Sequence, residues 1–384
     1  MFKFFSSIKG DKVIWVVVII LSIFSILAVY SSTGTLAYKY QSGNTEYYLF
    51  KHFTILIFGF ILMYVAHLIK YTYFSRISQI ALFITVPLLV FTLFSGTTYN
   101  EASRWLMLPV INLTFQTSDL AKFVLIIYVA RLLAKKQDEI KDFKLAFLPI
   151  MAPVLIICAL IFPANFSTAA VLFFTCIVLM FIGRINLKYI AYLIGIGIVS
   201  LLLMFMLANV YPNLLPRLDT WIARVENFND KESEGNYQVE QAKIAIATGG
   251  TFGKMPGNSK QRNFLPHPYS DFIYAIIIEE YGLFGGIVIV LLYLILFFRG
   301  VKIVSKCPGS FAAFLTIGLS FSLVFQALIN MAVAVNLLPV TGQPLPLISM
   351  GGTSIWFTSL AIGIILSVSK ETEKEEEQKQ EIVS

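Results

Sequence analysis

Long apolar runs separated by short polar segments dominate the chain. A helix needs about 17 to 25 apolar residues to cross the ~30 Å hydrocarbon core of a bilayer. The first run is longer than the apolar part of a cleaved signal peptide, and no small-residue cleavage site follows it. The pattern predicts an all-α polytopic membrane protein with ten transmembrane helices in one membrane domain, residues 1–369. The ten runs are 13–30, 53–69, 77–94, 119–134, 145–162, 166–183, 189–211, 271–298, 311–335 and 353–369.

Basic residues between the runs predict the orientation. The short segments on one side hold only Lys39, Lys51 and Arg104. Because Lys and Arg are enriched in cytoplasmic loops, the richer side is the cytoplasmic one and both termini lie inside. The residues of that richer side are Lys3, Lys9, Lys12, Lys70, Arg76, Arg131, Lys135, Lys136, Lys141, Lys144, Arg184, Lys188, Arg299, Lys302, Lys306, Lys370, Lys374 and Lys379.

Two polar segments break the pattern. Residues 212–270 form a long outer loop between the seventh and eighth runs, and loops of this length cross the membrane largely regardless of their charge. Within it, residues 237–247 have apolar positions at helical spacing, which predicts a short amphipathic helix against the membrane surface. Residues 248–253 predict a flexible turn. Residues 370–384 are rich in Lys, Glu and Gln, and we expect a disordered cytoplasmic tail.

Composition supports the membrane class. The chain is 57% hydrophobic and 13% charged, with a mean hydropathy of +0.78, whereas soluble domains contain about 25% charged residues. The net charge of +7 is spread over short loops, which indicates topology and lipid attraction rather than nucleic-acid binding. Neither the three cysteines nor the three histidines show the spacing of a metal site or a disulfide framework.

Charged residues within the apolar runs need a reason, because each costs a few kcal/mol in hydrocarbon. Asp119 and Lys122 are three residues apart and share a helix face. They form either a buried ion pair that fixes packing or the lining of a polar substrate cavity, and the sequence does not choose between these. Glu279 and Glu280 are adjacent, so they point in different directions, and a structural role is favoured over catalysis.

Residues 338–354 connect the last two runs and contain three prolines and three glycines. Regular helix is excluded there. Non-helical backbone at membrane depth is tolerated where protein or a water-filled cavity satisfies it. We therefore favour a semi-buried segment that lines a site over a plain outer loop.

Asp271 stands where the eighth run begins. An aspartate at this position is often only a helix cap or a first-turn acid. However, Lys254, Lys260 and Arg262 precede it, and such cations suit phosphate oxygens. The combination favours a site for a phosphorylated lipid at the outer membrane face.

Three stretches together resemble the FtsW/RodA (SEDS) family of bacterial division and elongation proteins. They are 104–122, with Arg104-Trp and Phe-Gln116-Thr-Ser-Asp119-Leu-Ala-Lys122; 241–285, with Gly257-Asn-Ser, Leu265-Pro266, Asp271-Phe-Ile and Glu279-Glu-Tyr-Gly282; and 338–352, with Pro-Leu-Pro and Ile-Ser349-Met-Gly351-Gly352. Their order and spacing agree with the family over nearly the whole chain. Residues 257–262 are closer to the division branch than to the elongation branch.

The resemblance implies a peptidoglycan glycosyltransferase that polymerises lipid II, an undecaprenyl-diphosphate-linked substrate, for septal wall synthesis. The essential acid of the family falls on Asp271, which suits a general base acting on the acceptor hydroxyl. The resemblance also implies two further sets of residues. Substrate-binding residues are expected at Arg104, Lys254, Lys260, Arg262, Asp119, Lys122, Ser349, Gly351 and Gly352. Supporting residues are expected at Glu279, Glu280, Gln116 and Pro266.

The chain departs from the family pattern at four places. Thr117 replaces a proline, and Asp119 replaces a glutamate whose longer side chain would reach Lys122 more easily. His267 stands where a glutamate is common. Asn165 replaces an aspartate before the sixth run, so a role that needs that carboxylate does not transfer. None of these changes affects Asp271.

Two other functions remain open. Ten spans with buried charges also suit a lipid II flippase or transporter, and a non-catalytic organiser of a transpeptidase complex is the third hypothesis. From the resemblance we expect a class B penicillin-binding protein and other division proteins as partners, membrane lipids as surroundings and no nucleic acid. The expected location is the bacterial cytoplasmic membrane, with the active site on its outer side. No metal-binding residues are predicted, and the sequence leaves open whether Mg²⁺ or Mn²⁺ helps to bind the diphosphate.

Overall fold

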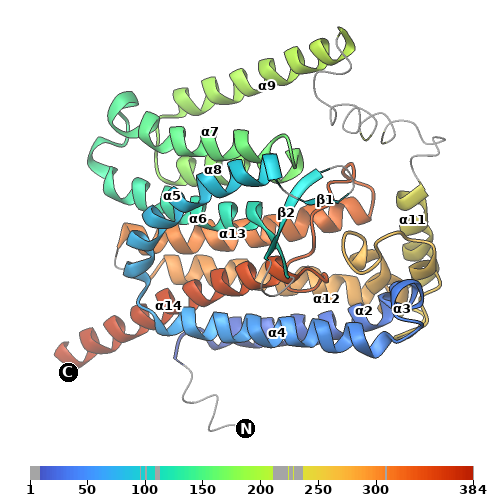
Figure 1. Ribbon diagram of the computed structural model, residues 1–384. Coiled ribbons are helices and arrows are strands. Elements are labelled where there is room, and N and C mark those ends of the chain that lie inside the picture. Colours follow the sequence, from blue (N-terminus) through green and yellow to red (C-terminus); the bar gives the residue numbers. More distant parts are fainter. Residues whose placement is uncertain are drawn as a thin grey trace.

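The computed structural model describes residues 9–95, 97–99, 102–108, 113–210, 224, 228, 237–307 and 309–383. Helices lie side by side and form one bundle (Figure 1). A helix overlaps each of the ten predicted apolar runs. These helices are α2 (Lys12–Ser32), α4 (Thr45–Leu68), α5 (Tyr71–Ser95), α6 (Thr117–Lys135), α7 (Leu148–Ile161), α8 (Phe166–Ile182), α9 (Leu187–Val210), α12 (Ile273–Val304), α13 (Ser310–Ala334) and α14 (Gly352–Val383).

Length and composition make seven helical segments suitable for crossing a membrane among the described residues. Phe166–Ile182 and Leu187–Ser200 are shorter apolar helices. Helix α6 is continuous but less apolar, since it carries the charged residues Asp119 and Lys122 near its start. The structure is therefore that of a helical membrane protein, as the hydrophobic pattern predicts.

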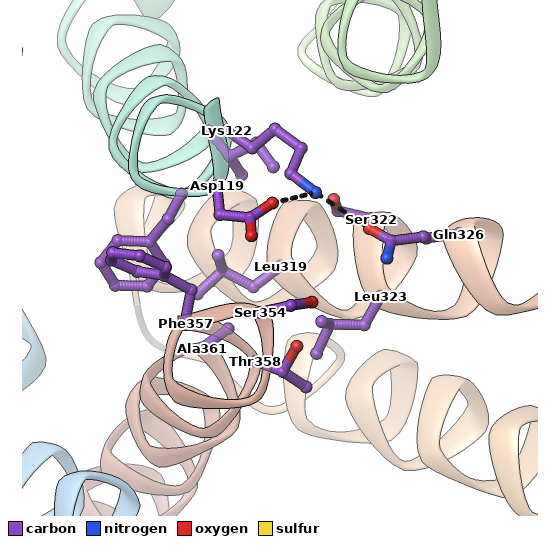
Figure 2. Close-up of a pocket in the computed structure, with 12 residues that line it drawn as sticks. Asp119, Lys122, Leu319, Ser322, Leu323, Gln326, Ser354, Phe357, Thr358 and Ala361 are labelled. Atoms are coloured by element: carbon purple, nitrogen blue, oxygen red, sulfur yellow. Dashed lines mark hydrogen bonds and ion pairs between the residues drawn. The ribbon is translucent and has the colours of Figure 1, made fainter. Parts of the chain in front are cut away.

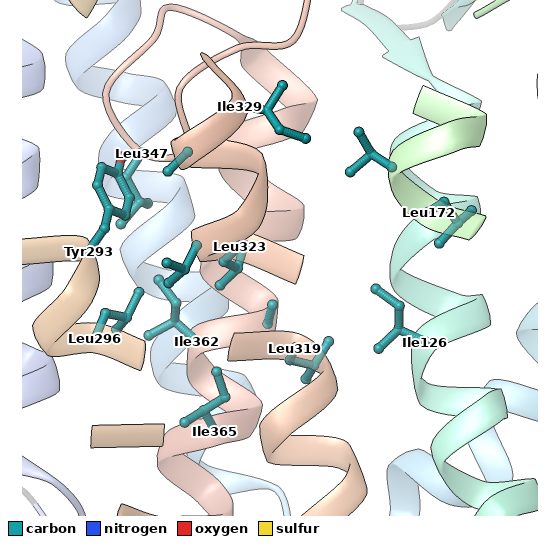
Figure 3. Packing of buried hydrophobic residues seen from close by; sticks show 14 of the residues in the cluster. Ile126, Leu172, Tyr293, Leu296, Leu319, Leu323, Ile329, Leu347, Ile362 and Ile365 are labelled. Carbon is teal, nitrogen blue, oxygen red and sulfur yellow. The ribbon is translucent and has the colours of Figure 1, made fainter. Parts of the chain in front are cut away.

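The hydrophobic core lies where helices α12, α13 and α14, near the C-terminus of the chain, pack against α2, α4 and α6, near its N-terminus. Helix α14 packs along α4, α13 packs between α12 and α6, and α2 contacts both α4 and α12. Aliphatic side chains from these helices interdigitate at the centre, as Leu319, Leu323, Ile362 and Ile126 do in Figure 3. Because helices distant in sequence share this core, it fixes the position of the segments that connect them.

A small sheet was not predicted, and it corrects the all-α expectation. Strands β1 (Thr97–Tyr99), β2 (Ala102–Leu108) and β3 (Leu113–Gln116) form an antiparallel sheet in the order β1-β2-β3. Trp105 of β2 pairs with Gln116 of β3. Since α6 begins at Thr117, the sheet leads directly into the helix that carries Asp119.

The predicted amphipathic helix is present as α11 (Tyr237–Gly249). Its buried face contains Val239, Ala242 and Ala245, and it packs against α12. Small side chains on that face allow the close approach. The other short helices are α3 (Gly34–Tyr40), the 3-10 helices η1 (Gln137–Glu139) and η4 (Gln261–Asn263), and the π-helix η2 (Phe143–Phe147). Apart from Arg224 and Phe228, residues 212–236 of the predicted outer loop lie outside the described residues.

The structure differs from the prediction of a disordered tail, because α14 continues to Val383. The Nζ atom of Lys370 donates hydrogen bonds to the carbonyl oxygens of His67 (2.6 Å) and Leu68 (3.2 Å), at the end of α4. Glu373 accepts a hydrogen bond of 2.9 Å from the amide of Gly10. Helical spacing brings these side chains to one face, so contacts that composition does not reveal hold the extension in place.

Candidate active site

Asp271 lies in a turn immediately before α12, which starts at Ile273. The N-cap of α12 is Phe272 and makes no side-chain cap hydrogen bond. The hydroxyl of Ser270 donates to Oδ1 of Asp271 at 2.8 Å. The residue is partly exposed. The carboxylate is thus held at the edge of the bundle without acting as the N-cap of α12.

Arg224 is the cation that sequence reasoning missed. Its Nη1 atom donates to the carbonyl oxygen of Val340 at 3.1 Å. Burial lowers the pKa of the Arg224 guanidinium, and the negative charge of Asp271 acts in the opposite direction. A guanidinium still remains charged at neutral pH. The two residues lie far apart in the sequence, and no local pattern in the outer loop indicates that the charge of Asp271 acts on Arg224.

An apolar pocket with a cavity volume of about 260 Å³ opens beside Arg224. Apart from Arg224, Ser167 and Thr341, the pocket is lined by apolar side chains. A cation at the edge of an apolar pocket suits a ligand with both a charged and an apolar part. The other lining residues are Phe166, Ala170 and Val171 of α8, Ile329 of α13, and Leu338, Pro339 and Val340.

The segment between α13 and α14 is non-helical and largely buried, as the sequence analysis favoured. Gln343, Leu345 and Ile348 are 3%, 0% and 0% exposed. Polar side chains from several helices satisfy its backbone. Ser25 of α2 donates to the carbonyl oxygen of Ile348 at 2.8 Å, and Tyr293 of α12 donates to that of Pro346.

Ser349 connects this segment to the residue before Asp271. Its hydroxyl donates to the carbonyl oxygen of Ser270 at 2.6 Å and accepts from the amide of Leu345 at 2.8 Å. The predicted substrate contact of Ser349 therefore competes with two backbone contacts. Gly351 and Gly352 are partly exposed, and Gly352 begins α14.

Asp119 and Lys122 form the predicted ion pair, with 3.0 Å between Nζ of Lys122 and Oδ1 of Asp119. The side chain of Asp119, although shorter than that of a glutamate, is therefore long enough to pair with Lys122. Nζ of Lys122 also donates to Oε1 of Gln326 at 3.1 Å, and the three side chains line a small pocket between α6, α13 and α14 (Figure 2). Apolar residues such as Leu323 and Phe357 complete the lining. The pair thus lines a cavity as well as joining two helices.

Two further predicted residues lie near the start of α6. Arg104 falls in β2, and its side chain is outside the described part of the chain. The amide of Gln116 donates to Oγ1 of Thr353 at 3.3 Å, and its Nε2 donates to Ser118 at 2.9 Å. Gln116 thus links the sheet to the start of α14.

The predicted loop cations surround Glu279 and Glu280, two acids that are 0% and 1% exposed. Lys254 forms an ion pair of 2.7 Å with Glu279. The backbone amide of Lys260 donates to Glu279 at 3.1 Å, while the Lys260 side chain is exposed. Arg262 donates to the carbonyl oxygen and hydroxyl of Ser31, at 2.9 and 3.0 Å. Lys254 and Arg262 therefore already have protein partners.

Helix α12 is kinked at Gly282, whose φ of 71° and ψ of −174° are not helical. The loop around residues 250–254 packs into the kink. Amides of Leu283 and Lys254 donate at 2.9 Å to the carbonyl oxygens of Gly250 and Glu279 respectively. A Cβ at Gly282 would lie 2.2 Å from the carbonyl oxygen of Thr251. The predicted flexible turn, residues 248–253, is part of this loop, and the loop satisfies backbone groups of the kinked helix.

Pro266 is exposed and lies in the bend between η4 and Asp271. The neighbouring His267 places Nδ1 3.3 Å from the hydroxyl of Tyr269. Among the described residues, no group of three or more His, Cys, Asp or Glu side chains is arranged to hold a metal ion. The site therefore presents one partly exposed acid, one nearby cation and an apolar pocket.

Comparisons with known proteins agree with this arrangement. The sequence profile of the FtsW/RodA/SpoVE cell cycle proteins matches residues 11–374. A protein named probable peptidoglycan glycosyltransferase FtsW, from Geobacter sp. (strain M18), is 33% identical over 94% of this chain and 96% of its own length.

Solved structures are also similar. A chain of a peptidoglycan synthase complex, described as coordinating polymerization and crosslinking, has a TM-score of 0.70 and 25% identity, covering 94% of this chain and 98% of that one. The rod shape determining protein RodA of Thermus thermophilus has a TM-score of 0.68 and 20% identity, over 95% of this chain and 98% of its own. The fold and the sequence profile lead to the same conclusion: the chain belongs to the FtsW/RodA/SpoVE family of cell cycle proteins.

Proposed function

We propose that this protein is a peptidoglycan glycosyltransferase that polymerises lipid II into glycan strands during cell division. Family membership over residues 11–374 and the name of the Geobacter relative support the activity. The observation that carries the site assignment is the placement of Asp271. It is partly exposed, lies outside the helix, and its negative charge acts on the guanidinium of Arg224.

Asp271 acts as the general base in this proposal. Its carboxylate takes the proton from the 4-hydroxyl of the acceptor sugar. The resulting oxygen nucleophile attacks the anomeric carbon of the donor and forms the new glycosidic bond. The bond from that carbon to the lipid diphosphate breaks, and the diphosphate leaves with the electron pair.

The leaving diphosphate gains negative charge, and cations fixed nearby stabilise it. Arg224 is our candidate for this role, because it lines the apolar pocket and the negative charge of Asp271 acts on its guanidinium. The exposed Lys260 side chain and Arg104 are further candidates from the sequence analysis. Lys254 and Arg262 are assigned instead to holding the loop on Glu279 and Ser31.

In the proposed topology, ten helices span the inner membrane with both termini in the cytoplasm. Support comes from the helices that overlap the ten predicted runs, seven of which are long and apolar enough to span among the described residues. The end of the bundle where Arg299 and Lys306 meet Asp11 and Glu376 is the cytoplasmic one, in agreement with the positive-inside rule. Asp271 lies at the opposite end, on the outer face, where lipid II presents its sugars.

A transpeptidase of the class B penicillin-binding type is the proposed partner. The support is the similar chain from a synthase complex described as coupling polymerization to crosslinking. A complex of this kind would deliver new glycan strands directly to the crosslinking enzyme.

The polar pocket at Asp119 and Lys122 gives one reason to consider lipid II translocation as well. Reconstitution separates the two activities. The purified protein, with its transpeptidase partner, is placed in liposomes that contain labelled lipid II. Glycan strands on a gel support the proposal, whereas movement of lipid II across the bilayer without polymer would favour a flippase. Absence of both would favour a non-catalytic organiser.

A further inference from the structure

Asn330 of α13 connects the segment before α12 to the segment before α14. It is 1% exposed. Its Nδ2 atom donates to the carbonyl oxygen of Asp271 at 2.9 Å and to that of Gln343 at 2.7 Å. Only the NH₂ group of a carboxamide can donate to two acceptors, so these contacts fix the orientation of the side chain.

Gln326 lies one helical turn before Asn330 and makes a parallel contact. Its Nε2 atom donates to the carbonyl oxygen of Pro344 at 2.9 Å. Residues four apart share a helix face, so α13 presents two carboxamides that bind two successive carbonyl groups. Oε1 of Gln326 also accepts from Lys122, the partner of Asp119. The buried ion pair is thereby linked to the same segment.

The contact to Asp271 is significant because this residue lies in a turn rather than in the regular hydrogen-bond ladder of α12. The orientation of its peptide group decides where its Cβ points. The hydroxyl of Ser270 donates to the carboxylate, but Ser270 belongs to the same turn, whose preceding carbonyl group is held by Ser349. Asn330 is anchored in a long buried helix. It therefore supplies a fixed reference for the turn.

We infer that Asn330 is a positioning residue for Asp271, and that Gln326 supports it by holding the adjacent backbone at Pro344. This inference rests on the proposed role of Asp271 as the base. A general base must lie within hydrogen-bond reach of the proton that it takes. A displacement of about 1 Å can cost about 100-fold in rate. Loss of Asn330 should therefore lower the turnover number of correctly folded protein.

The test measures kcat and KM for lipid II polymerisation in the protein–transpeptidase complex, normalised to the folded fraction. Asn330→Leu keeps the branching at Cγ and removes the donor, and we expect kcat to fall about 100-fold with KM changed less than about threefold. Asn330→Gln keeps the carboxamide and should recover part of the loss. Gln326→Leu should lower kcat by only about tenfold. Gln326 has no direct contact with the turn and holds the backbone at Pro344, next to the Gln343 carbonyl group that Asn330 binds.

Ser320→Ala is the matched control. Ser320 is buried on the same helix and lacks a hydrogen-bond partner in the described part of the chain. We expect this variant to keep the parental kcat. A purely structural role predicts that Asn330→Leu lowers only the folded fraction and leaves kcat per folded molecule at the parental value, and that result would overturn the inference.

Asp271→Asn in the same assay separates the two levels of the argument. If this variant is inactive while Asn330→Leu and Gln326→Leu keep the parental kcat, only the positioning role is wrong. If Asp271→Asn keeps the parental kcat, the proposed function of Asp271 and the inference fail together. If Asn330→Leu does not fold, the other two variants, Asn330→Gln and Gln326→Leu, test the inference. A reduced kcat in Gln326→Leu supports it, and a parental kcat in both variants overturns it.

Discussion

Nζ of Lys254 lies 2.7 Å from Oε1 of Glu279, which joins the outer loop to the kinked half of α12. Glu279 also accepts hydrogen bonds from the hydroxyl of Ser259 and from the amides of Lys260 and Gln261, the last two at 3.1 and 3.2 Å. One carboxylate therefore organises the stretch of loop that leads to Asp271.

Glu279→Gln should destabilise the protein more than Lys254→Ala does. The amide of a glutamine would face groups that are already donors, and we expect a loss of about 3 kcal/mol in unfolding free energy. Lys254→Ala leaves Glu279 with its other donors, and the ion pair is partly exposed, so about 1 kcal/mol is expected. Unfolding in detergent with increasing denaturant gives both values. Equal losses would contradict the central role of Glu279.

The kink at Gly282 predicts a sharp difference between two glycines. Gly282→Ala combines a positive φ with a Cβ only 2.2 Å from the carbonyl oxygen of Thr251, and we expect a loss above about 3 kcal/mol. Gly250 also has a positive φ, but no atom lies within 4 Å of its added Cβ. Gly250→Ala should therefore cost only about 1 kcal/mol. Comparison of their unfolding midpoints tests the geometry, and similar midpoints would count against it.

Arg224 and Lys260 offer a test of which cation serves the site. Arg224→Gln should lower polymerisation by about 100-fold, because it removes a fixed charge where the diphosphate develops charge. Lys260→Gln serves as the comparison and should have a smaller effect. The reverse order of effects would favour the assignment made from the sequence.

The extension of α14 predicts slow hydrogen exchange in a segment whose composition suggests disorder. Amides of residues 371–376 should exchange at least about tenfold more slowly than in an unfolded chain, because the helix is docked by Lys370, Glu373 and Glu376. Lys370→Met should raise these exchange rates. Rates equal to those of an unfolded peptide in the parent protein would rule out the docked helix.

Much of the fold follows from local sequence pattern. Each apolar run coincides with a helix because backbone groups in lipid must be satisfied within the segment. The irregular segment after α13 was predictable from its prolines and glycines, and the Asp119–Lys122 pair from its three-residue spacing. These features depend on residues close together in the chain.

The remaining features depend on contacts that local pattern does not encode. The charge of Asp271 acts on Arg224, which lies 47 residues earlier in the chain, and Asn330 donates to the carbonyl oxygen of Asp271 from α13. The sequence predicts Lys254 as a phosphate ligand, whereas in the structure its ammonium group pairs with Glu279. For the α14 extension a local signal did exist: Glu371 and Lys374 are three residues apart and form an ion pair, a spacing that favours helix.

The central claim is that Asp271 is the base for lipid II polymerisation, and its most direct test is the rate of glycan-strand formation by Asp271→Asn. The purified variant and the parent, each with the transpeptidase partner, receive the same labelled lipid II, and the initial rate per folded molecule is measured on a gel. The amide keeps the shape of the side chain but cannot take the proton, so we expect a rate at least about 100-fold below that of the parent. A rate equal to that of the parent would contradict the account.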